Sequence, residues 1–464
     1  MAKARLAARR LTIARCALIA VALMLAGAPA FAQAPLPAGW PSQQVEIGLA
    51  DFPNGAAAMR ATTTFAFRYQ YLAGGVNTGN GWSTWNTNGD FPRFYIQESA
   101  AAGITPVFTY YMLLQSLPGG GGESDADFTN ANNTATMTAF YNDLILFFQK
   151  AALFPTTKVI LHVEPDFWGY MEQRSTNDDA RSVSAKVSET GIAALAGLPS
   201  TVAGMAQAVV RLRNTYAPNV ILGYHISVWG TRVDIALQNP TDAEVDVLAQ
   251  RAAAFYNSLG ASFDIAFGEF SDRDSGFYQF IYGDQGRSWW DADDFRRNVR
   301  FLGGFSAQAG KRIVMWQIPL GNQAMRSMNN SWGHYQDNRM QWLFDEPART
   351  HLQAYRDAGV VAFLFGGGAS GTTCACDTIA DGVTNPAAIN GNAIASELAV
   401  PGSAPALVTR GSTPTLVTPY AADDDGGFFR WKAWDYYRSG AMPLSGGITT
   451  PPPGPVRNLR LVRP

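Results

Sequence analysis

The chain has 464 residues, of which 47% are hydrophobic, 16% charged and 12% aromatic, and its formal net charge is −2. Such a chain is long enough to bury a large core and to keep aromatic side chains for a ligand surface. A mildly acidic protein is a poor binder of nucleic acid. No run of about 18 apolar residues follows the N-terminal segment, so no membrane-spanning helix is expected. Neither nucleic acid nor a membrane is therefore an expected partner.

The first 32 residues have the pattern of an export signal. Five basic residues lie between Lys3 and Arg15, residues 16–24 are apolar, and Ala30-Phe31-Ala32 fits the small-x-small cleavage pattern. We therefore expect residues 1–32 to be a signal peptide and the mature protein to be secreted or periplasmic. Removal of the segment lowers the net charge by five, from −2 to −7.

Eight short apolar runs, rich in β-branched and aromatic residues, follow in chain order and are typical of buried strands. They are residues 45–52, 65–71, 105–112, 158–166, 220–227, 263–270, 312–319 and 360–365. Amphipathic helical patterns lie between them, for example at residues 135–150, 201–216, 241–259, 291–309 and 346–358, and a last helix is expected at 428–438.

The alternation of eight strands with helices predicts an α/β fold, a (β/α)8 TIM barrel. The rival architecture is a doubly wound open sheet, which usually has a glycine-rich phosphate turn after its first strand. Residues 51–55, with the sequence DFPNG, do not form such a turn.

Long connections gather at one end of the predicted barrel. The strand-to-helix segments 73–92, 114–133, 167–200, 271–290, 320–345 and 366 to the early 420s are long, whereas the helix-to-strand turns are short. In barrels the long loops carry the active site. We expect residues 33–42 to be a leader, 43–447 a single barrel domain with long βα loops, and 448–464 a proline-rich linker with a short tail.

Two glutamates stand at predicted strand ends, where side chains face a common pocket. Glu164 ends the fourth strand and Glu269 the sixth. Such a pair suits glycoside cleavage, in which one carboxyl group protonates the leaving oxygen and the other attacks or activates water. We assign Glu164 as the acid, because the like charge of Asp166 would raise its pKa, and Glu269 as nucleophile or base. The roles could be exchanged, and the alternative for Glu164 is a structural bond to a residue such as Arg68.

Other polar and aromatic residues at the strand ends and in the long loops complete the predicted site. Supporting groups are Asp166, Asp272, Asp274, His225 and Gln317, although Asp272 and Asp274 could instead belong to a polar turn. Aromatic rings stack on sugar faces and amides hold hydroxyl groups. The expected substrate-binding residues are Asp51, Arg68, Tyr110, Trp168, Trp229, Trp316, Asn322 and Trp332.

Other chemistries lack their motifs. No G-x-S-x-G elbow follows a strand, and the four histidines have no HExxH spacing. Cys374 and Cys376 are too close together to bridge distant segments, and structural zinc sites usually need a second ligand pair. We therefore expect neither a metal nor a cofactor.

The combination of an exported barrel, opposed glutamates and many tryptophans resembles the (β/α)8 glycoside hydrolases. Residues 163–166 (VEPD) and 272–274 (DRD) are similar to motifs of the family six cellobiohydrolases, where the two occur in the opposite order. A pairing of strands four and six is similar to that of the α-galactosidase and α-glucosidase clans, which use aspartates. The resemblance implies a secreted, monomeric glycoside hydrolase acting on a carbohydrate. The alternative is a barrel that binds saccharide or cell-wall material without cleaving it.

Overall fold

The computed structural model describes residues 33–323, 330, 335–366, 406–410, 413–417 and 428–444. The predicted signal peptide, the linker after residue 448, Trp332 and both Cys374 and Cys376 lie outside these ranges. No helix among the described residues is both long and apolar enough to cross a membrane.

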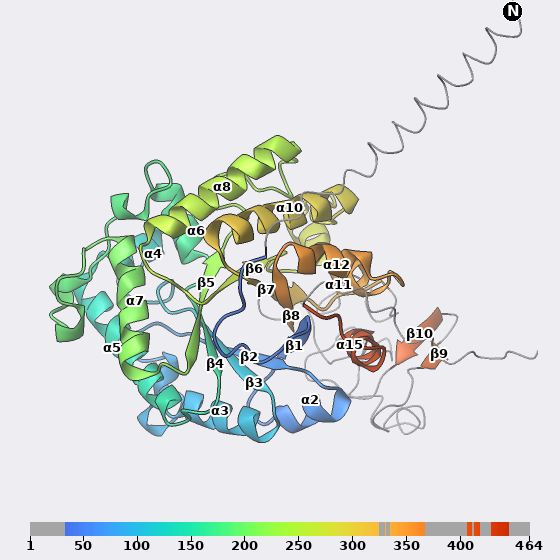
Figure 1. Cartoon of the computed structure of the whole chain (residues 1–464), viewed down its shortest axis with the longest axis horizontal. Helices are drawn as coiled ribbons and strands as arrows, with labels where there is room; N and C mark the ends of the chain where they lie inside the picture. Colours follow the sequence, from blue (N-terminus) through green and yellow to red (C-terminus); the bar gives the residue numbers. More distant parts are fainter. Residues whose placement is uncertain are drawn as a thin grey trace, which may run out of the picture. The chain divides into compact units, whose positions relative to one another are not determined.

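Eight parallel strands close into a barrel in chain order, which confirms the predicted (β/α)8 fold (Figure 1). Each strand pairs with the next, and β1 also pairs with β8. The strands are β1 Glu46–Ala50, β2 Phe67–Leu72, β3 Thr105–Tyr110, β4 Val159–Val163, β5 Val220–Ile226, β6 Ile265–Glu269, β7 Ile313–Pro319 and β8 Val360–Gly366. All eight lie where the apolar runs predict them.

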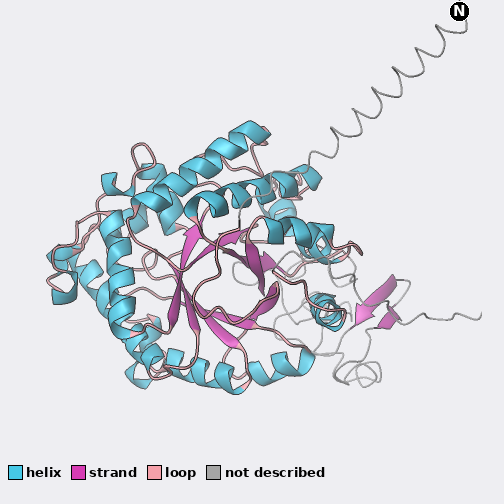
Figure 2. Ribbon diagram, in the orientation of Figure 1, coloured by secondary structure: helices cyan, strands magenta, loops and turns pink. Residues whose placement is uncertain are grey.

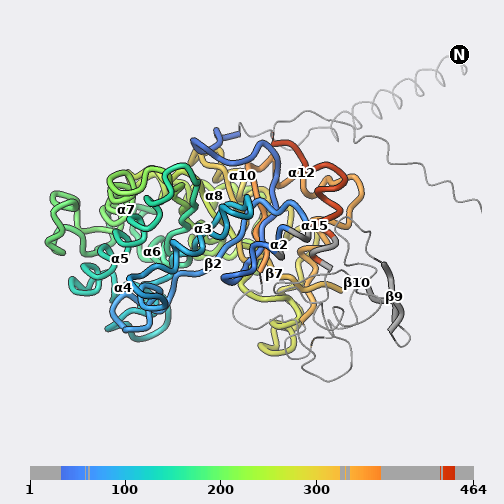
Figure 3. The backbone as a smooth tube through the Cα atoms, turned by 90° about the horizontal axis from the view of Figure 1, so that it is seen from below, coloured from blue at the N-terminus to red at the C-terminus, as the bar shows by residue number. Residues whose placement is uncertain are grey.

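Helices surround the ring of strands (Figure 2), and a side view follows the backbone along the barrel (Figure 3). They are α2 Ala56–Thr62, α3 Phe91–Ala101, α4 Glu123–Ala131, α5 Thr134–Ala152, α6 Phe167–Arg174, α7 Val202–Tyr216, α8 Asp242–Ser258, α9 Ser275–Phe277, α10 Ala292–Ala309, α11 Arg339–Phe344, α12 Thr350–Asp357 and α15 Phe428–Arg438. A separate antiparallel pair is formed by β9 Ala406–Arg410 and β10 Thr413–Val417. Capping boxes at Thr241 and Asp291 explain why α8 and α10 begin where the sequence predicts.

Strand alternation divides the side chains between the barrel interior and the helix layer. His162 of β4 contacts side chains of β5, β6 and β7, so it points inward. Its ring stacks on Phe267 at 4.1 Å, and a Cβ at Gly223 would lie 2.4 Å from the Phe267 ring. A glycine is therefore needed on β5 to admit this stack. Tyr224, the next residue, points outward and packs on Tyr256 of α8.

Candidate active site

Three ionisable side chains meet at the ends of β4, β5 and β6. Asp166, His225 and Glu269 each offer a ligand atom within 4.8 Å of those of the other two. His225 Nε2 lies 3.8 Å from Glu269 Oε1. His225 is fully buried and Glu269 nearly so, whereas Asp166 is partly buried. No other group of this kind exists among the described residues.

The backbone at the end of β4 decides which carboxylates meet. The strand ends at Val163, and Glu164 and Asp166 then adopt φ values of 42° and 25°. Residues other than glycine seldom occupy this region, and such strained residues cluster at functional sites. Because the extended conformation stops at Val163, the period-two alternation cannot be continued to residues 164 and 166. Asp166 instead precedes the first turn of α6 and lies beside Glu269.

Glu164 does not join this group. Its Oε1 accepts hydrogen bonds from the backbone N–H groups of Met112 and Leu113, at 3.0 and 3.2 Å, just beyond β3. The side chain is 1% exposed, and burial followed by the charge of Asp127 raises its pKa. The group of ligand atoms within 4.8 Å of one another thus contains Asp166 and Glu269 and does not contain Glu164.

The surroundings of Asp166 favour its protonated form. Burial is the main cause that raises the pKa of this carboxyl group, and the negative charge of Glu269 is the next. Glu123, Asp127 and Asp272 add smaller effects of the same sign. A carboxylic acid that keeps its proton beside a second carboxylate is the arrangement expected of a general acid.

Two buried polar side chains, His162 and Thr109, lie in a row on the Nδ1 side of His225. His162 Nε2 and His225 Nδ1 are 3.0 Å apart, and Thr109 Oγ1 lies 3.5 Å from His162 Nδ1. Burial and the neighbouring His225 lower the pKa of His162, so this imidazole is neutral. The edge of Trp316 contacts both rings. His225 Nε2 has no hydrogen-bond partner among the described residues, and it points towards Glu269.

Gln317 and Asp272 lie at the same mouth. Tyr71 O–H donates to Gln317 Oε1 at 2.9 Å, and Gln317 Nε2 donates to the Asp272 carbonyl at 3.4 Å. Gln317 has a φ of 55° at an irregularity of β7. The Asp272 carboxylate accepts from Tyr278 and pairs with Arg273. Asp274, in contrast, is fully buried and accepts from the Gly321 amide at 2.9 Å, so it organises the loop.

Several expected substrate-binding residues face the helix layer instead of the mouth. Arg68 forms a buried ion pair of 2.7 Å with Asp51 and stacks on Tyr95 of α3. Tyr110 O–H donates to Asp143 of α5 at 2.7 Å. These side chains occupy outward positions of their strands, so they support the wall of the barrel.

Three other expected substrate-binding residues differ in burial: two are buried and one is partly exposed. Trp168 is buried, and its indole N–H donates to the Val163 carbonyl at 2.8 Å. Asn322 is also fully buried. Trp229 is partly buried and packs on Tyr170, with ring centroids 4.7 Å apart.

Four further residues belong near the site. Tyr71 bonds to Gln317, and Tyr111 donates to Glu123 on α4. Charges of Asp166 and Glu269 contribute to raising the pKa of Tyr170, after burial and the charge of Glu123. Strand alternation signals Tyr71, which shares the inward side of β2 with Tyr69. Glu123 gives no sequence signal, because it reaches the site from a helix inside a loop.

Comparison with known proteins gives only distant likenesses. No family model and no curated protein matches the chain. It is similar to the GH53 catalytic domain of Ignisphaera aggregans, with 11% identity and a TM-score of 0.40 over 72% of this chain and 87% of that one. It is similar to a family 1 β-glucosidase of Thermotoga maritima, with 9% identity and a TM-score of 0.39 over 67% and 75%. It is also similar to a GH6 enzyme of Orpinomyces sp. Y102, with 10% identity and a TM-score of 0.31 over 83% of this chain and 95% of that one. Values this low carry no inference about family or activity.

Proposed function

We propose that this chain is a secreted glycoside hydrolase in which Asp166 is the general acid and Glu269 the nucleophile. The proposal is supported by one observation above all, the approach of their carboxylate oxygens to within 4.8 Å. Carboxyl groups about 5–5.5 Å apart are typical of retaining enzymes, whereas inverting pairs stand about 6.5–9.5 Å apart to admit a water molecule. The geometry therefore favours retention of the anomeric configuration.

The reaction then has two steps. Asp166 gives its proton to the glycosidic oxygen while Glu269 Oε1 or Oε2 attacks the anomeric carbon, so the leaving alcohol departs and a glycosyl ester forms on Glu269. Asp166, now ionised, removes a proton from water, which attacks the same carbon and releases Glu269. The chain through Thr109 and His162 holds His225 with Nε2 towards Glu269, where the tautomer that is protonated at Nε2 can orient the nucleophile.

The aromatic pair Tyr170 and Trp229 is the proposed contact surface for a sugar ring near this centre. The two rings lie 4.7 Å apart, and Tyr170 feels the charges of Asp166 and Glu269. Apolar sugar faces pack on such rings while the phenol and indole rims remain polar. Gln317, held by Tyr71, offers an amide to a sugar hydroxyl.

The test is hydrolysis of a polysaccharide panel by the mature protein and by Asp166→Asn and Glu269→Gln. Each substitution should lower kcat by about 10²- to 10⁴-fold, the usual contribution of such groups. With an aryl glycoside whose phenol leaves without protonation, Asp166→Asn should retain far more of its first step than Glu269→Gln. Proton NMR of the first-formed anomer should show retention. Saccharide binding without any turnover would instead support the non-catalytic barrel.

Metal-assisted hydrolysis is a second candidate, and the unpartnered His225 Nε2 is the observation that favours it. Two carboxylate oxygens and one imidazole nitrogen form a donor set that suits divalent transition metals. The His162 ring would then orient His225 as a neighbour of the ligand. Prolonged dialysis against a chelator decides between the candidates: the two-carboxylate mechanism keeps its full rate, whereas a metal mechanism loses it.

A further inference from the structure

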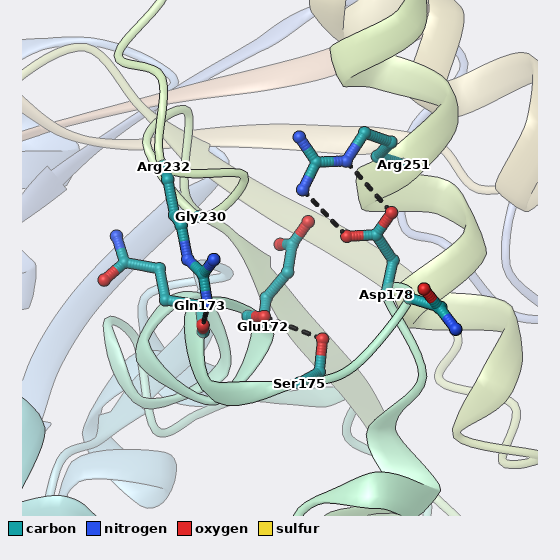
Figure 4. Close-up of a pocket in the computed structure, with 8 residues that line it drawn as sticks. Glu172, Gln173, Ser175, Asp178, Gly230, Arg232 and Arg251 are labelled. Carbon is teal, nitrogen blue, oxygen red and sulfur yellow. Dashed lines mark hydrogen bonds and ion pairs between the residues drawn. The ribbon is translucent and has the colours of Figure 1, made fainter.

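A polar cavity lies beside α6, apart from the carboxylate pair. It has a volume of about 240 Å³ and is bounded by the end of α6, the turn that follows it, the loop after β5, and α8 (Figure 4). Its lining is polar and contains Glu172, Gln173, Asp178, Arg232 and Arg251. No aromatic side chain lines it.

Most charges around the cavity compensate one another. Arg251 donates two hydrogen bonds to the Asp178 carboxylate, each 3.0 Å long, and a third to the Thr231 carbonyl at 3.2 Å. Arg232 donates to the Gln173 carbonyl. Asp178 compensates one of the two guanidinium groups, and Glu172 compensates the other only when it is ionised, whereas burial raises its pKa to about 8.

Glu172 is the exception to this compensation. Its side chain is 5% exposed, and its Oε1 is buried with no hydrogen-bond partner among the described residues. Figure 4 shows its carboxyl group in the middle of the lining, between Arg232 and the Asp178–Arg251 pair. A Cβ at Gly230 would lie 2.5 Å from Glu172 Oε2, so glycine at position 230 leaves room for the carboxyl group. A buried carboxyl group without a partner is destabilising, and a ligand that donates a hydrogen bond would compensate it.

Helix α6 connects the cavity with the carboxylate pair, because Asp166 directly precedes this helix and Glu172 lies on it. Glu172 follows Asp166 by six residues, which is about 9 Å of helix rise along α6. Gln173 Nε2 donates to the Trp229 carbonyl at 3.2 Å, and the Trp229 ring packs on Tyr170. The cavity is thus adjacent to the aromatic pair proposed to hold a sugar near the reacting bond.

We propose that this cavity is an accessory saccharide subsite, in which hydroxyl groups of one sugar unit donate to Glu172 and accept from Arg232. Hydroxyl groups both donate and accept, which matches a lining of carboxyl, amide and guanidinium groups. The volume admits one ring. The choice of a saccharide over another hydroxylated molecule rests on the proposed glycosidase function.

The experiment measures binding of D-glucose, D-galactose, D-mannose and D-xylose to the full mature chain by NMR titration. The background is the double variant Asp166→Asn/Glu269→Gln, so that no sugar is consumed or transferred. Glu172→Leu and Gly230→Ala should each weaken binding of the preferred sugar about tenfold, the loss expected for one hydrogen bond. Glu172→Gln should bind, because its amide also donates and accepts. Gly122→Ala is the matched control, since nothing lies within 4 Å of its added Cβ.

Thermal unfolding separates a ligand site from a structural one. Glu172→Leu should raise Tm, because it removes an unpartnered carboxyl group, while binding is lost; a lower Tm or unchanged binding overturns the proposal. Glycerol binding as tightly as the sugars overturns the saccharide assignment. If the wild type hydrolyses a polysaccharide but no sugar binds at the cavity in the NMR titration, the subsite is overturned and the proposed function stands. If sugar binding depends on Glu172 but the wild type hydrolyses no polysaccharide, the subsite is supported and the proposed glycosidase function is rejected.

Discussion

At the scale of single residues, the proposed acid depends on neighbours that are far away in the sequence. After burial, the negative charges of Glu269 on β6 and Glu123 on α4 raise the pKa of Asp166. The Glu123 carboxylate is itself held by the Tyr111 hydroxyl, so its position is fixed. Since a like charge nearby disfavours ionisation, Glu123 helps Asp166 to keep its proton at a pH where Glu269 must be ionised.

Glu123→Gln should therefore move the alkaline limb of the pH–rate profile to lower pH. The amide removes one negative charge and keeps an acceptor for Tyr111, so the pKa of Asp166 falls and its proton is lost earlier. The measurement is kcat/KM against pH for both proteins. Asp293→Asn removes an equal charge from the exposed start of α10 and should leave the limb in place. An unmoved limb in Glu123→Gln would reject Asp166 as the acid.

At the scale of elements, the end of β4 shows where sequence reasoning reaches its limit. The apolar pattern of residues 158–166 locates the strand, but Glu164 at φ 42° lies beyond its last extended residue. Its carboxylate then bridges to β3, where it satisfies two backbone N–H groups that β4 does not pair. Glu164 thus joins two neighbouring units of the barrel.

Glu164→Leu should destabilise the fold by about 2–6 kcal/mol, because it leaves the buried N–H groups of Met112 and Leu113 without an acceptor. Glu164→Gln keeps one oxygen acceptor and should recover most of this loss. Urea unfolding gives the free energies, and kcat on the same samples tests the role. Glu164→Gln should retain turnover where Asp166→Asn does not. Loss of turnover at unchanged stability would return the acid role to Glu164.

The sequence predicts strands and helices better than the direction of individual side chains. Repeated apolar runs locate all eight strands, because burial and backbone hydrogen bonding act along a whole segment. Strand alternation would also have placed Arg68 and Tyr110 outside the barrel, since Tyr69 and Thr109 occupy the inward positions. The positive φ of Asp166 could not be predicted, because it arises from packing around one turn.

At the scale of the whole molecule, buried acids are numerous. Burial raises the pKa of Asp143 to about 6 and that of Glu172 to about 8. It also raises the pKa values of Asp127, Glu164 and Asp166. An acid whose pKa is raised on folding binds more protons in the folded state than in the unfolded state. The free energy of unfolding therefore falls as pH rises between the unfolded and folded pKa values.

Other acids act in the opposite direction, and they set the lower edge of the stable range. Hydrogen bonds from Arg93 and Lys150 lower the pKa of Asp90 to about 2, and those from Ser200 and the local backbone lower that of Glu189 to about 2. The stability that these groups add is present above their unfolded pKa and is lost as pH falls towards 2. Glu189 is exposed and Asp90 partly exposed, so solvent screens both ion pairs and their contribution is small beside that of the buried acids.

The full chain should therefore be most stable on the acidic side of neutrality, at about pH 4–6, and lose stability from there to about pH 8. Glu172 alone accounts for on the order of 5 kcal/mol of this decline, the free energy that corresponds to a pKa rising from 4.5 to about 8. Glu172→Gln cannot titrate, so its unfolding free energy should decline less over the same interval, and the two curves should separate progressively between pH 4.5 and 8. Denaturant unfolding at closely spaced pH values measures both. Parallel curves would show that Glu172 is ionised throughout, and thus that a cation or donor within the protein already compensates its charge.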